Sequence, residues 1–589
     1  MSQSVPGATT AEQESKDTLG SILAALDARS NFKLEAGAGA GKTTSLIDTL
    51  RHILENRPQY LPRDGQRVAC ITYTNVARNE IIRRTDGSPH VFAETIHGFL
   101  WEAISRFRKS LLQEVLTLPG WSGKLDGLSS LLDYEVSYDL GFRGIDENTV
   151  RLHHEDVPAL AIRLFAKQKF RKLVADRFPI ILVDEYQDTP AGLAEAMLGE
   201  HSGADSVYGF FGDHWQQIYD KSCGSIDHLP VERLQKKANW RSSQAVVDFL
   251  NNMRPELPQA AVADAKLGSV TVYHTNEWSG PRGTHSKKGQ IPDGALKDTL
   301  RWVAERSRRH HVDEAKGAAK VLMLTHSSIA TELGFGNIDR AFKRNEEYSR
   351  KNDDVVAFLL DIVEPCCEYF SNKQYGPMFD LLKRSRPRMR KRSDKTGWAD
   401  LFAWINVARE WGTVGNVIDT LLSQEYFAVP QAVVSRHRKW ELACRDLDED
   451  QELTEPRRLV EYGKFRDVAY REVMALREYV EENTPFSTQH GVKGAEYPSV
   501  LAVFGGWNMY NFPEMLASFP RRATLVGDDK KRFERWRNLF YVACSRAQEH
   551  LVLLFTTEIP SGGLETLKEW VGESNIVAVR YSKEDTVEP

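Results

Sequence analysis

The sequence contains no pair of cysteines spaced C-x-x-C, although six cysteines occur among its 589 residues. This absence excludes the usual signatures of zinc ribbons and iron–sulfur clusters and argues against a disulfide framework, so we expect buried thiols. No apolar run approaches the roughly 20 residues that are needed to cross a bilayer. The N-terminal residues also lack the basic and apolar regions of a signal peptide, and we therefore expect a cytoplasmic protein without a membrane partner.

An excess of basic charge is absent too. The chain carries 77 Lys and Arg against 82 Asp and Glu, a formal net charge of −5. No overall positive field would attract nucleic acid, so any bound nucleic acid must lie in a local groove. The composition is that of a globular protein, with 41% hydrophobic and 27% charged residues. At this length we expect about three or four domains or subdomains.

What is present is a loop of alternating Gly and Ala at residues 34–44, LEAGAGAGKTT, between a short strand and an amphipathic helix. Small residues let backbone N–H groups surround a phosphate chain, and the helix N-terminus faces the same anion. Lys42 would reach the β- and γ-phosphates, and the Thr43 hydroxyl would bind Mg²⁺. A flexible Gly/Ala linker is the alternative, which the patterned flanks disfavour. The predicted nucleotide-binding residues are Ala36, Gly37, Ala38, Gly39, Ala40, Gly41, Lys42, Thr43 and Thr44.

A fully apolar strand ends in two carboxylates at residues 178–185, FPIILVDE. Such a strand is typically central in a parallel sheet, and ligands bind at the carboxyl ends of parallel strands. Asp184 can hold Mg²⁺ through water, and Glu185 can orient and deprotonate an attacking water. A strand that merely ends in a polar turn is the alternative. The pair would supply the metal ligand and the general base that the phosphate loop lacks.

Strands alternate with helices from residue 32 to about residue 250, and a second α/β unit is split by a long insertion. We predict an α/β fold. The first unit takes residues 1–98 and 178–250 with an insertion at 99–177, and the second takes 251–328 and 481–589 with an insertion at 329–480. Both insertions are predicted to be mainly helical. The second contains the most basic run, residues 383–392, which is either a phosphate-binding surface or a solvated loop.

Eight motifs complete the pattern. In chain order they are AGAGAGKTT, TYTNVA, TIHG, LVDEYQDT, GDHWQQIY, NWRSS, STQHGVKGAEYP and LFYVACSRA. The ordered set resembles UvrD/Rep/PcrA-type superfamily 1 DNA helicases across both α/β units, though not in the insertions. The resemblance implies two RecA-like P-loop domains with parallel sheets, each interrupted by an insertion. ATP would lie between the two domains, with single-stranded DNA running across their top.

The resemblance also implies roles at the nucleotide. Gln216 corresponds to the γ-phosphate sensor, and Arg241 and Arg546 to two arginines that reach the γ-phosphate. Because Arg546 comes from the second domain, it would act only when the cleft is closed. Trp240 stands where the family usually has a Tyr stacked on adenine, and an indole offers a larger face. Glu496 corresponds to a residue that contacts the ribose.

Further positions correspond to residues that touch DNA in this family, where aromatic faces stack on bases without reading their sequence. They are Tyr73, Thr74, Asn75, Thr95, His97, Tyr219 and His490. Two departures from the family pattern follow. Lys221 replaces an aromatic residue two positions after Tyr219, so a phosphate contact would replace a stacking platform. Gln13 is the upstream candidate for the adenine-recognising glutamine, at an unusually long distance, and its role is left open.

The resemblance predicts an ATP- and Mg²⁺-dependent DNA helicase and translocase that moves 3′ to 5′ on single-stranded DNA, in DNA repair, recombination or phage defence. The alternative is an ATP-gated, DNA-bound regulatory subunit of a nuclease complex with little unwinding of its own. The second insertion is shorter than in the housekeeping helicases, and the motor layout is similar to the helicase partners of phage-defence systems such as Gabija. The expected partners are single-stranded DNA, tailed duplex DNA and, for the alternative, a nuclease or other protein subunit.

Overall fold

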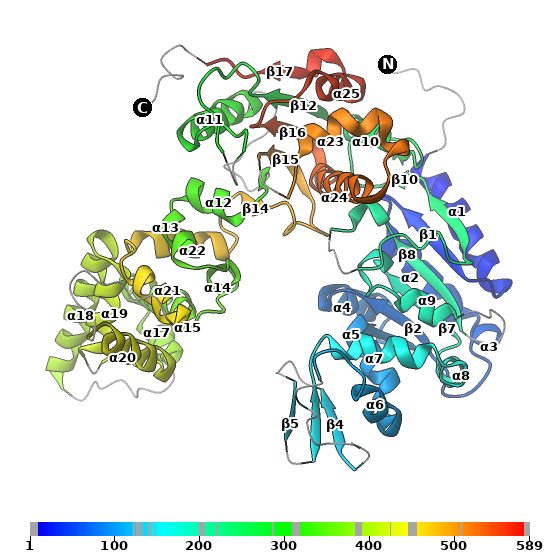
Figure 1. Cartoon of the computed structure of the whole chain (residues 1–589), viewed down its shortest axis with the longest axis horizontal. Helices are drawn as coiled ribbons and strands as arrows, with labels where there is room; N and C mark the ends of the chain where they lie inside the picture. Colours follow the sequence, from blue (N-terminus) through cyan, green and yellow to red (C-terminus); the bar gives the residue numbers. More distant parts are fainter. Residues whose placement is uncertain are drawn as a thin grey trace.

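The computed structural model describes most of the chain. The described residues are 10–121, 124, 131, 133–138, 143–146, 148–199, 206–218, 222–284, 288–308, 319–382, 391–424, 426–445, 456–506 and 509–581. Within these ranges, no helix combines the length and the apolar character that a membrane span requires. Two large sheets and two insertions make up the molecule (Figure 1).

The first sheet has six strands in the order β3-β2-β7-β8-β1-β9, and every neighbouring pair is parallel. Its strands are β1 (Phe32–Ala36), β2 (Val68–Thr72), β3 (Val91–Thr95), β7 (Ile180–Asp184), β8 (Val207–Gly212) and β9 (Glu232–Lys236). The central strands are buried along their whole length, which explains their nearly continuous apolar sequences. The helices beside this sheet are α1 (Ala11–Asp27), α2 (Lys42–Glu55), α3 (Arg57–Tyr60), α4 (Asn75–Arg84) and α9 (Leu193–Leu198). Helix α10 (Gln244–Met253) packs instead against the second sheet described below.

The second sheet also has six parallel strands, in the order β14-β13-β15-β16-β12-β17. Its strands are β12 (Ser269–His274), β13 (Ala319–Met323), β14 (Phe486–Thr488), β15 (Tyr497–Phe504), β16 (Ala547–Phe555) and β17 (Ile576–Ala578). Its helices are α11 (Asp293–Arg308), α23 (Phe512–Ser518), α24 (Gly527–Cys544) and α25 (Ser561–Val571). A short two-stranded pair, β10 (Ala238–Asn239) and β11 (Ala260–Ala261), lies between the two units in sequence. The predicted fold class, two RecA-like α/β units with parallel sheets, is confirmed.

The first insertion is helical but also contains a small sheet that the sequence analysis did not predict. Its helices are α5 (Ile96–Ile104), α6 (Arg108–Val115), α7 (Asp156–Phe165) and α8 (Gln168–Arg177). Its strands are β4 (Glu135–Tyr138), β5 (Gly144–Asp146) and β6 (Thr149–Leu152), paired in the order β4-β6-β5. With three or four residues each, these strands are too short to show the alternation that identifies a strand.

The second insertion is helical throughout its described part and lies apart from the first insertion in Figure 1. Its helices are α12 (His326–Leu333), α13 (Gly336–Ala341), α14 (Glu346–Ser349), α15 (Asp354–Phe358), α16 (Glu364–Ser371), α17 (Tyr375–Leu381), α18 (Arg392–Trp411), α19 (Val414–Leu422), α20 (Gln431–Arg445), α21 (Arg457–Arg466) and α22 (Arg471–Val480). Most of the basic run, residues 383–390, lies outside the described residues, so its role stays open.

The domain limits, which divide the chain at residues 98, 177, 250, 328 and 480, remain predictions. All six cysteines are free, as expected, but the expectation that all are buried was wrong. Cys70, Cys366, Cys367 and Cys544 are buried, whereas Cys223 and Cys444 are only partly buried. Cys444 lies near the end of α20, where Val433 is the helix's one buried residue, so this helix covers little of a thiol on it.

Candidate nucleotide cleft and nucleic-acid track

The phosphate loop connects β1 to α2. Gly39 and Gly41 both have φ of +74°, a left-handed conformation that glycine adopts without strain. A Cβ on Gly39 would lie 2.7 Å from the Asn239 side-chain oxygen, so only glycine fits there. Gly41 is the N-cap residue of α2, and no described side chain caps this helix. The first N–H groups of α2 are therefore available to an anion.

Two acidic residues lie at the end of β7 beside this loop: Asp184 is the last residue of the strand, and Glu185 follows it. The Nζ of Lys42 lies 3.4 Å from Oε2 of Glu185. Burial, together with the neighbouring Glu185 carboxylate, raises the pKa of Asp184 to about 7. Burial also acts to raise the pKa of Glu185, but Lys42 and Lys493 outweigh it and lower that pKa. Glu185 is thus the ionised member of the pair, as a general base must be.

The same residues fit a magnesium ion. The Asp184 carboxylate is buried, and its Oδ1 accepts a hydrogen bond from the Glu185 amide at 3.1 Å. A hard divalent cation would relieve both causes of its raised pKa, burial and the neighbouring negative charge. Thr43 lies at the start of α2 and lines the cleft that Asp184 lines. Carboxylate and hydroxyl oxygens are ligands that Mg²⁺ prefers, so the donor set agrees with the predicted metal residues.

A lysine that the sequence analysis missed joins the two units. The Nζ of Lys493 donates to both carboxylate oxygens of Asp188, at 2.7 and 2.6 Å, and to the main-chain oxygen of Gln216 at 2.6 Å. The side chain of Gln216 donates to Asp213 at 2.8 Å. Lys493 lies within the motif STQHGVKGAEYP, between His490 and Glu496. Its position inside that motif was the signal that could have identified it.

The two predicted arginines both line the cleft but make different contacts. Arg241 forms an ion pair with Glu496 and donates to the main-chain oxygen of Ser545 at 3.4 Å. Arg546 is fully buried and donates to the oxygens of Val542 and Ala495 and to the Ser545 hydroxyl. Burial, together with the nearby Arg241 charge, lowers the pKa of Arg546 to about 10. In this structure, the Arg546 guanidinium is therefore held by its own unit.

An exposed indole lines the cleft where adenine is predicted to bind. Trp240 is 47% exposed, and its Nε1 donates to the Ser15 hydroxyl on α1 at 3.0 Å. Gln13, on the first turns of α1, instead donates to Asp17 at 2.8 Å from an exposed position. Its side chain is thus occupied within its own helix.

A cleft of about 1070 Å³ gathers most of the predicted nucleotide residues. It is lined by residues 37–44 and by Asp184, Glu185, Gln216, Trp240, Arg241, Glu496 and Arg546. The predicted DNA contacts Tyr73, Thr74 and His490 line it as well. Residues from both units thus meet around one space, which is large enough for a nucleotide.

The predicted DNA contacts of the first unit lie where strands of its sheet end. Tyr73, 45% exposed, follows β2. The hydroxyls of Thr74 and Thr95 accept from backbone amides and cap α4 and α5, and Asn75 is the first residue of α4. The His97 ring stacks on His154 of the first insertion, with centroids 3.6 Å apart. Tyr219 and Lys221 lie outside the described residues.

A second cavity of about 610 Å³ lies at the ends of β13 and β14. It is lined by polar residues that the sequence analysis missed, Thr325, His326, Ser327 and Ser328, together with Thr488 and His490. Like residues 72–75, this stretch is a strand that ends in hydroxyl and imidazole groups, which was the available signal. This cavity would extend the predicted nucleic-acid track from His490 along the second unit.

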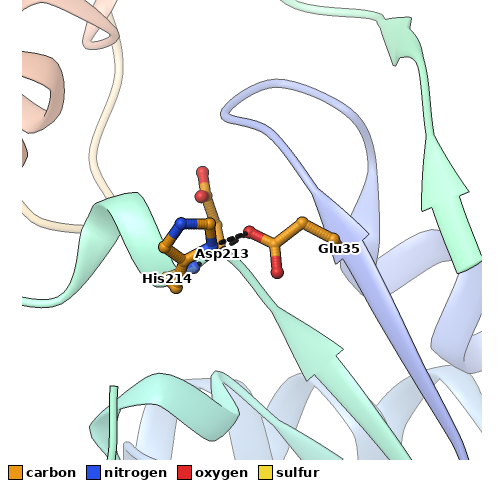
Figure 2. Close-up of side chains that lie close together, drawn as sticks. All are labelled: Glu35, Asp213 and His214. Carbon is orange, nitrogen blue, oxygen red and sulfur yellow. Dashed lines mark hydrogen bonds and ion pairs between the residues drawn. The ribbon is translucent and has the colours of Figure 1, made fainter. Parts of the chain in front are cut away.

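Figure 2 shows a cluster near the ends of β1 and β8, formed by the buried Glu35 and Asp213 and the partly buried His214. Their ligand atoms lie within 4.8 Å of one another, close enough for a metal ion. However, Nδ1 of His214 donates to Glu35 at 2.7 Å, and Arg254 donates to Glu35 at 2.8 Å and to Asp213 at 2.7 Å. Burial acts to raise the pKa of Glu35, but His214, Arg254 and Lys33 hold it well below its usual range. The cluster thus contains its own cation, and we assign no metal to it.

Two family models match the first unit and the first part of the second unit. A family described as an AAA domain matches residues 21–221, and one described as the viral superfamily 1 RNA helicase core domain matches residues 140–328. With the two parallel sheets and the phosphate loop, these matches indicate the class of the protein. The chain is similar to P-loop proteins of the superfamily 1 helicase type, as its motifs predicted. Helicase domains of this kind use ATP and act on nucleic acid.

Within that class, a relative aligns with nearly the whole chain. The Gabija protein GajB of Bacillus cereus (strain HuB5-5) is 23% identical over an alignment of 703 residues, which covers 95% of this chain and 98% of GajB. The alignment spans the insertions as well as the two units, so the chain is related to GajB throughout its architecture.

Proposed function

We propose that the protein is an ATP- and Mg²⁺-dependent DNA helicase and translocase that moves 3′ to 5′ on single-stranded DNA and acts in phage defence. The observation that supports the proposal is the cleft, which gathers the phosphate loop, the Asp184–Glu185 pair and arginines from two parts of the chain. The relation to GajB favours phage defence over repair or recombination.

The residues divide the chemistry of ATP hydrolysis among them. The loop amides and Lys42 bind the triphosphate, and Thr43 and Asp184 hold the metal. Bound Mg²⁺ neutralises charge on the phosphates. Glu185 orients the attacking water and accepts its proton. Arg241 and Arg546 stabilise charge on the γ-phosphate once each guanidinium leaves its present partners.

A short segment after β14 couples this chemistry to nucleic acid. In this proposal Glu496 contacts the ribose and His490 contacts the nucleic acid. Lys493, between them, binds Asp188 and the Gln216 main chain. A change at the nucleotide therefore moves the second unit's nucleic-acid contacts relative to Tyr73 and His97 of the first. Alternating closure and opening of the cleft then advances the strand.

The binding mode would be independent of base sequence. Tyr73, His97 and His490 present rings that stack on any base, and the Thr74 and Thr95 region offers main-chain and hydroxyl donors to phosphates. The net charge of −5 is consistent with a strand held in a local track rather than on a broadly basic face.

A second candidate function, the ATP-gated subunit of a larger complex, is favoured by one surface feature. Helix α18 exposes Trp404 (65%), Val407 (59%) and Trp411 (86%) at spacings of three and four residues, which places them on one face. Exposed aromatic residues at such spacing are typical of protein-binding surfaces. A protein partner bound to the second insertion would control ATP binding and hydrolysis by this chain, or its own activity would be controlled by them.

One experiment separates the two. ATP hydrolysis is measured with and without single-stranded DNA, alongside displacement of a strand from duplexes with 3′ or 5′ tails. If DNA stimulates ATP hydrolysis and only the duplex with a 3′ tail is unwound, the result supports a motor that acts by itself. If DNA stimulates hydrolysis but neither duplex is unwound, the result supports the gated subunit. Wild-type turnover by Lys42→Ala would contradict both, because each assigns hydrolysis to this site.

A further inference from the structure

A second lysine lies directly beneath the phosphate loop. Lys236 is the last residue of β9, which pairs with β1 so that Lys236 lies opposite Ala36. Its side chain is buried, with 2% of the residue exposed. The Nζ donates to the main-chain oxygen of Gly41 at 3.2 Å and to the Ser45 hydroxyl at 2.7 Å. Both acceptors belong to the junction at which the phosphate loop becomes α2.

This position is costly for a cation. Lysine is almost never fully buried unless an acidic partner accompanies it. The acceptors here are neutral oxygens, and Asp48 on α2 acts on the amine only through its charge. A helix N-terminus also repels positive charge. Burial lowers the pKa of Lys236 to about 8, which reflects this cost. An apolar side chain of equal length would avoid it, so the charge needs a reason other than stability.

The contact with Gly41 supplies that reason. The Gly41 oxygen and the Lys42 N–H belong to the same peptide unit, and this N–H is the first of α2. A cation bound to the oxygen polarises the peptide and makes its N–H a stronger donor. The Gly41 oxygen also accepts from the Ser45 amide at 3.1 Å, so Lys236 clamps the peptide in position. Its charge further raises the positive potential on the side of the loop that faces the anion.

We propose that Lys236 is a positioning residue of the nucleotide site, which strengthens binding of the polyphosphate of nucleoside di- and triphosphates through the Gly41–Lys42 peptide. It acts on the loop and does not touch the nucleotide. The inference rests on the proposed function, because it assumes that this loop binds ATP. It adds to that function a residue on β9, outside the eight motifs of the sequence.

The test is equilibrium binding of fluorescent ADP and ATP to the full-length wild type and to Lys236→Met, with thermal unfolding of each protein with and without nucleotide. Methionine keeps the length of the side chain and removes its charge and its donors. We expect ADP and ATP to bind about tenfold more weakly, with a matching fall in the nucleotide-induced rise of Tm. Without nucleotide, the variant should unfold at the wild-type temperature or above, because a buried cation has been removed.

The matched control is Lys237→Met. Lys237 is the next residue, outside the phosphate-loop contacts and only partly buried, so its removal should leave both affinities within about twofold of wild type. If Lys236→Met does not fold, Ser45→Ala removes one of the two acceptors without changing the charge. That variant should weaken ADP binding by a smaller factor, about two- to threefold.

Failure of the inference and failure of the proposed function give different results. A wild type that binds neither nucleotide overturns the proposed function. A wild type that binds both, with Lys236→Met equal to it, overturns the role of Lys236 alone. So does a Lys236→Met protein that unfolds at a lower temperature without nucleotide yet binds ADP normally, because that result assigns Lys236 to stability. Unchanged binding in Ser45→Ala overturns it where Lys236→Met cannot be made.

Discussion

Lys493 and Asp188 stand 305 positions apart, yet the lysine Nζ lies 2.7 and 2.6 Å from the two carboxylate oxygens of Asp188. The same ammonium binds the Gln216 main chain. One side chain from the segment that follows β14 therefore contacts both the acidic motif and Gln216, the predicted γ-phosphate sensor of the first unit. In the proposed function, this contact is the physical connection through which domain closure acts on hydrolysis.

Replacing Lys493 by Met should uncouple ATP turnover from nucleic acid. The loop and Glu185 remain, so ATP affinity should stay within about threefold of wild type, whereas stimulation by single-stranded DNA should fall at least about tenfold. Steady-state hydrolysis over a range of DNA concentrations measures both. The control is Lys531→Met, which changes an exposed lysine on α24. Full stimulation in Lys493→Met would show that coupling takes another route.

Glu185→Gln should bind ATP but hydrolyse it slowly. The amide keeps the shape of the side chain and loses the proton acceptor, so we expect kcat to fall by a factor of about 10² to 10⁴. Lys42 also loses its acidic neighbour at 3.4 Å, so nucleotide affinity should not decrease. Single-turnover hydrolysis and equilibrium binding of ATP separate the two effects. Near-normal turnover would remove Glu185 from the role of base.

The His97–His154 stack should make stability depend on pH. Burial, together with the neighbouring His154, lowers the pKa of His97 to about 4. Between about pH 6.5 and pH 4 the unfolded chain binds a proton that the folded His97 does not, so stability falls as pH falls through this window. His97→Phe keeps the stacking and does not titrate, so its Tm should fall less over the same range. Parallel Tm profiles of wild type and His97→Phe would contradict this, and His228→Gln, at an exposed histidine, is the control.

The parts of the site that the sequence predicted are those whose signal is local. The phosphate loop and the Asp184–Glu185 pair each combine a strand, its polar end and the residues that follow, so a short stretch carries the whole pattern. The three strands of the first insertion were missed because each is shorter than one clear alternation. Lys236 gains its role from a strand that pairs with β1 only after folding, and no spacing in the sequence relates Lys236 to Gly41. Lys493 gains its role from contacts between the two units. Gln13 is a candidate that the sequence offered for adenine recognition, but only the structure shows that its side chain is bound to Asp17.

Arg254 gives the last prediction, because it is the cation between two buried carboxylates. It lies 2.8 Å from Glu35 and 2.7 Å from Asp213, and all three side chains are almost fully buried. Arg254→Met leaves two negative charges without that partner, and breaking such a pair from one side costs about 3–5 kcal/mol. Urea unfolding at pH 7 measures this loss. Arg51→Met, which breaks an exposed pair with Asp48, should cost less than about 1 kcal/mol.

The pH dependence of that loss tests its cause. In the wild type, the pKa of Glu35 lies well below its usual range, so its contribution is complete above the unfolded pKa and is lost as pH falls through the folded pKa. Without Arg254 the pKa of Glu35 should rise, and the carboxyl can then escape the cost of burial by taking a proton. The difference in unfolding free energy between wild type and Arg254→Met should therefore shrink from pH 7 to pH 5. A constant difference would mean that Arg254 stabilises the protein by packing against Trp215 and Tyr541, whose rings it also faces.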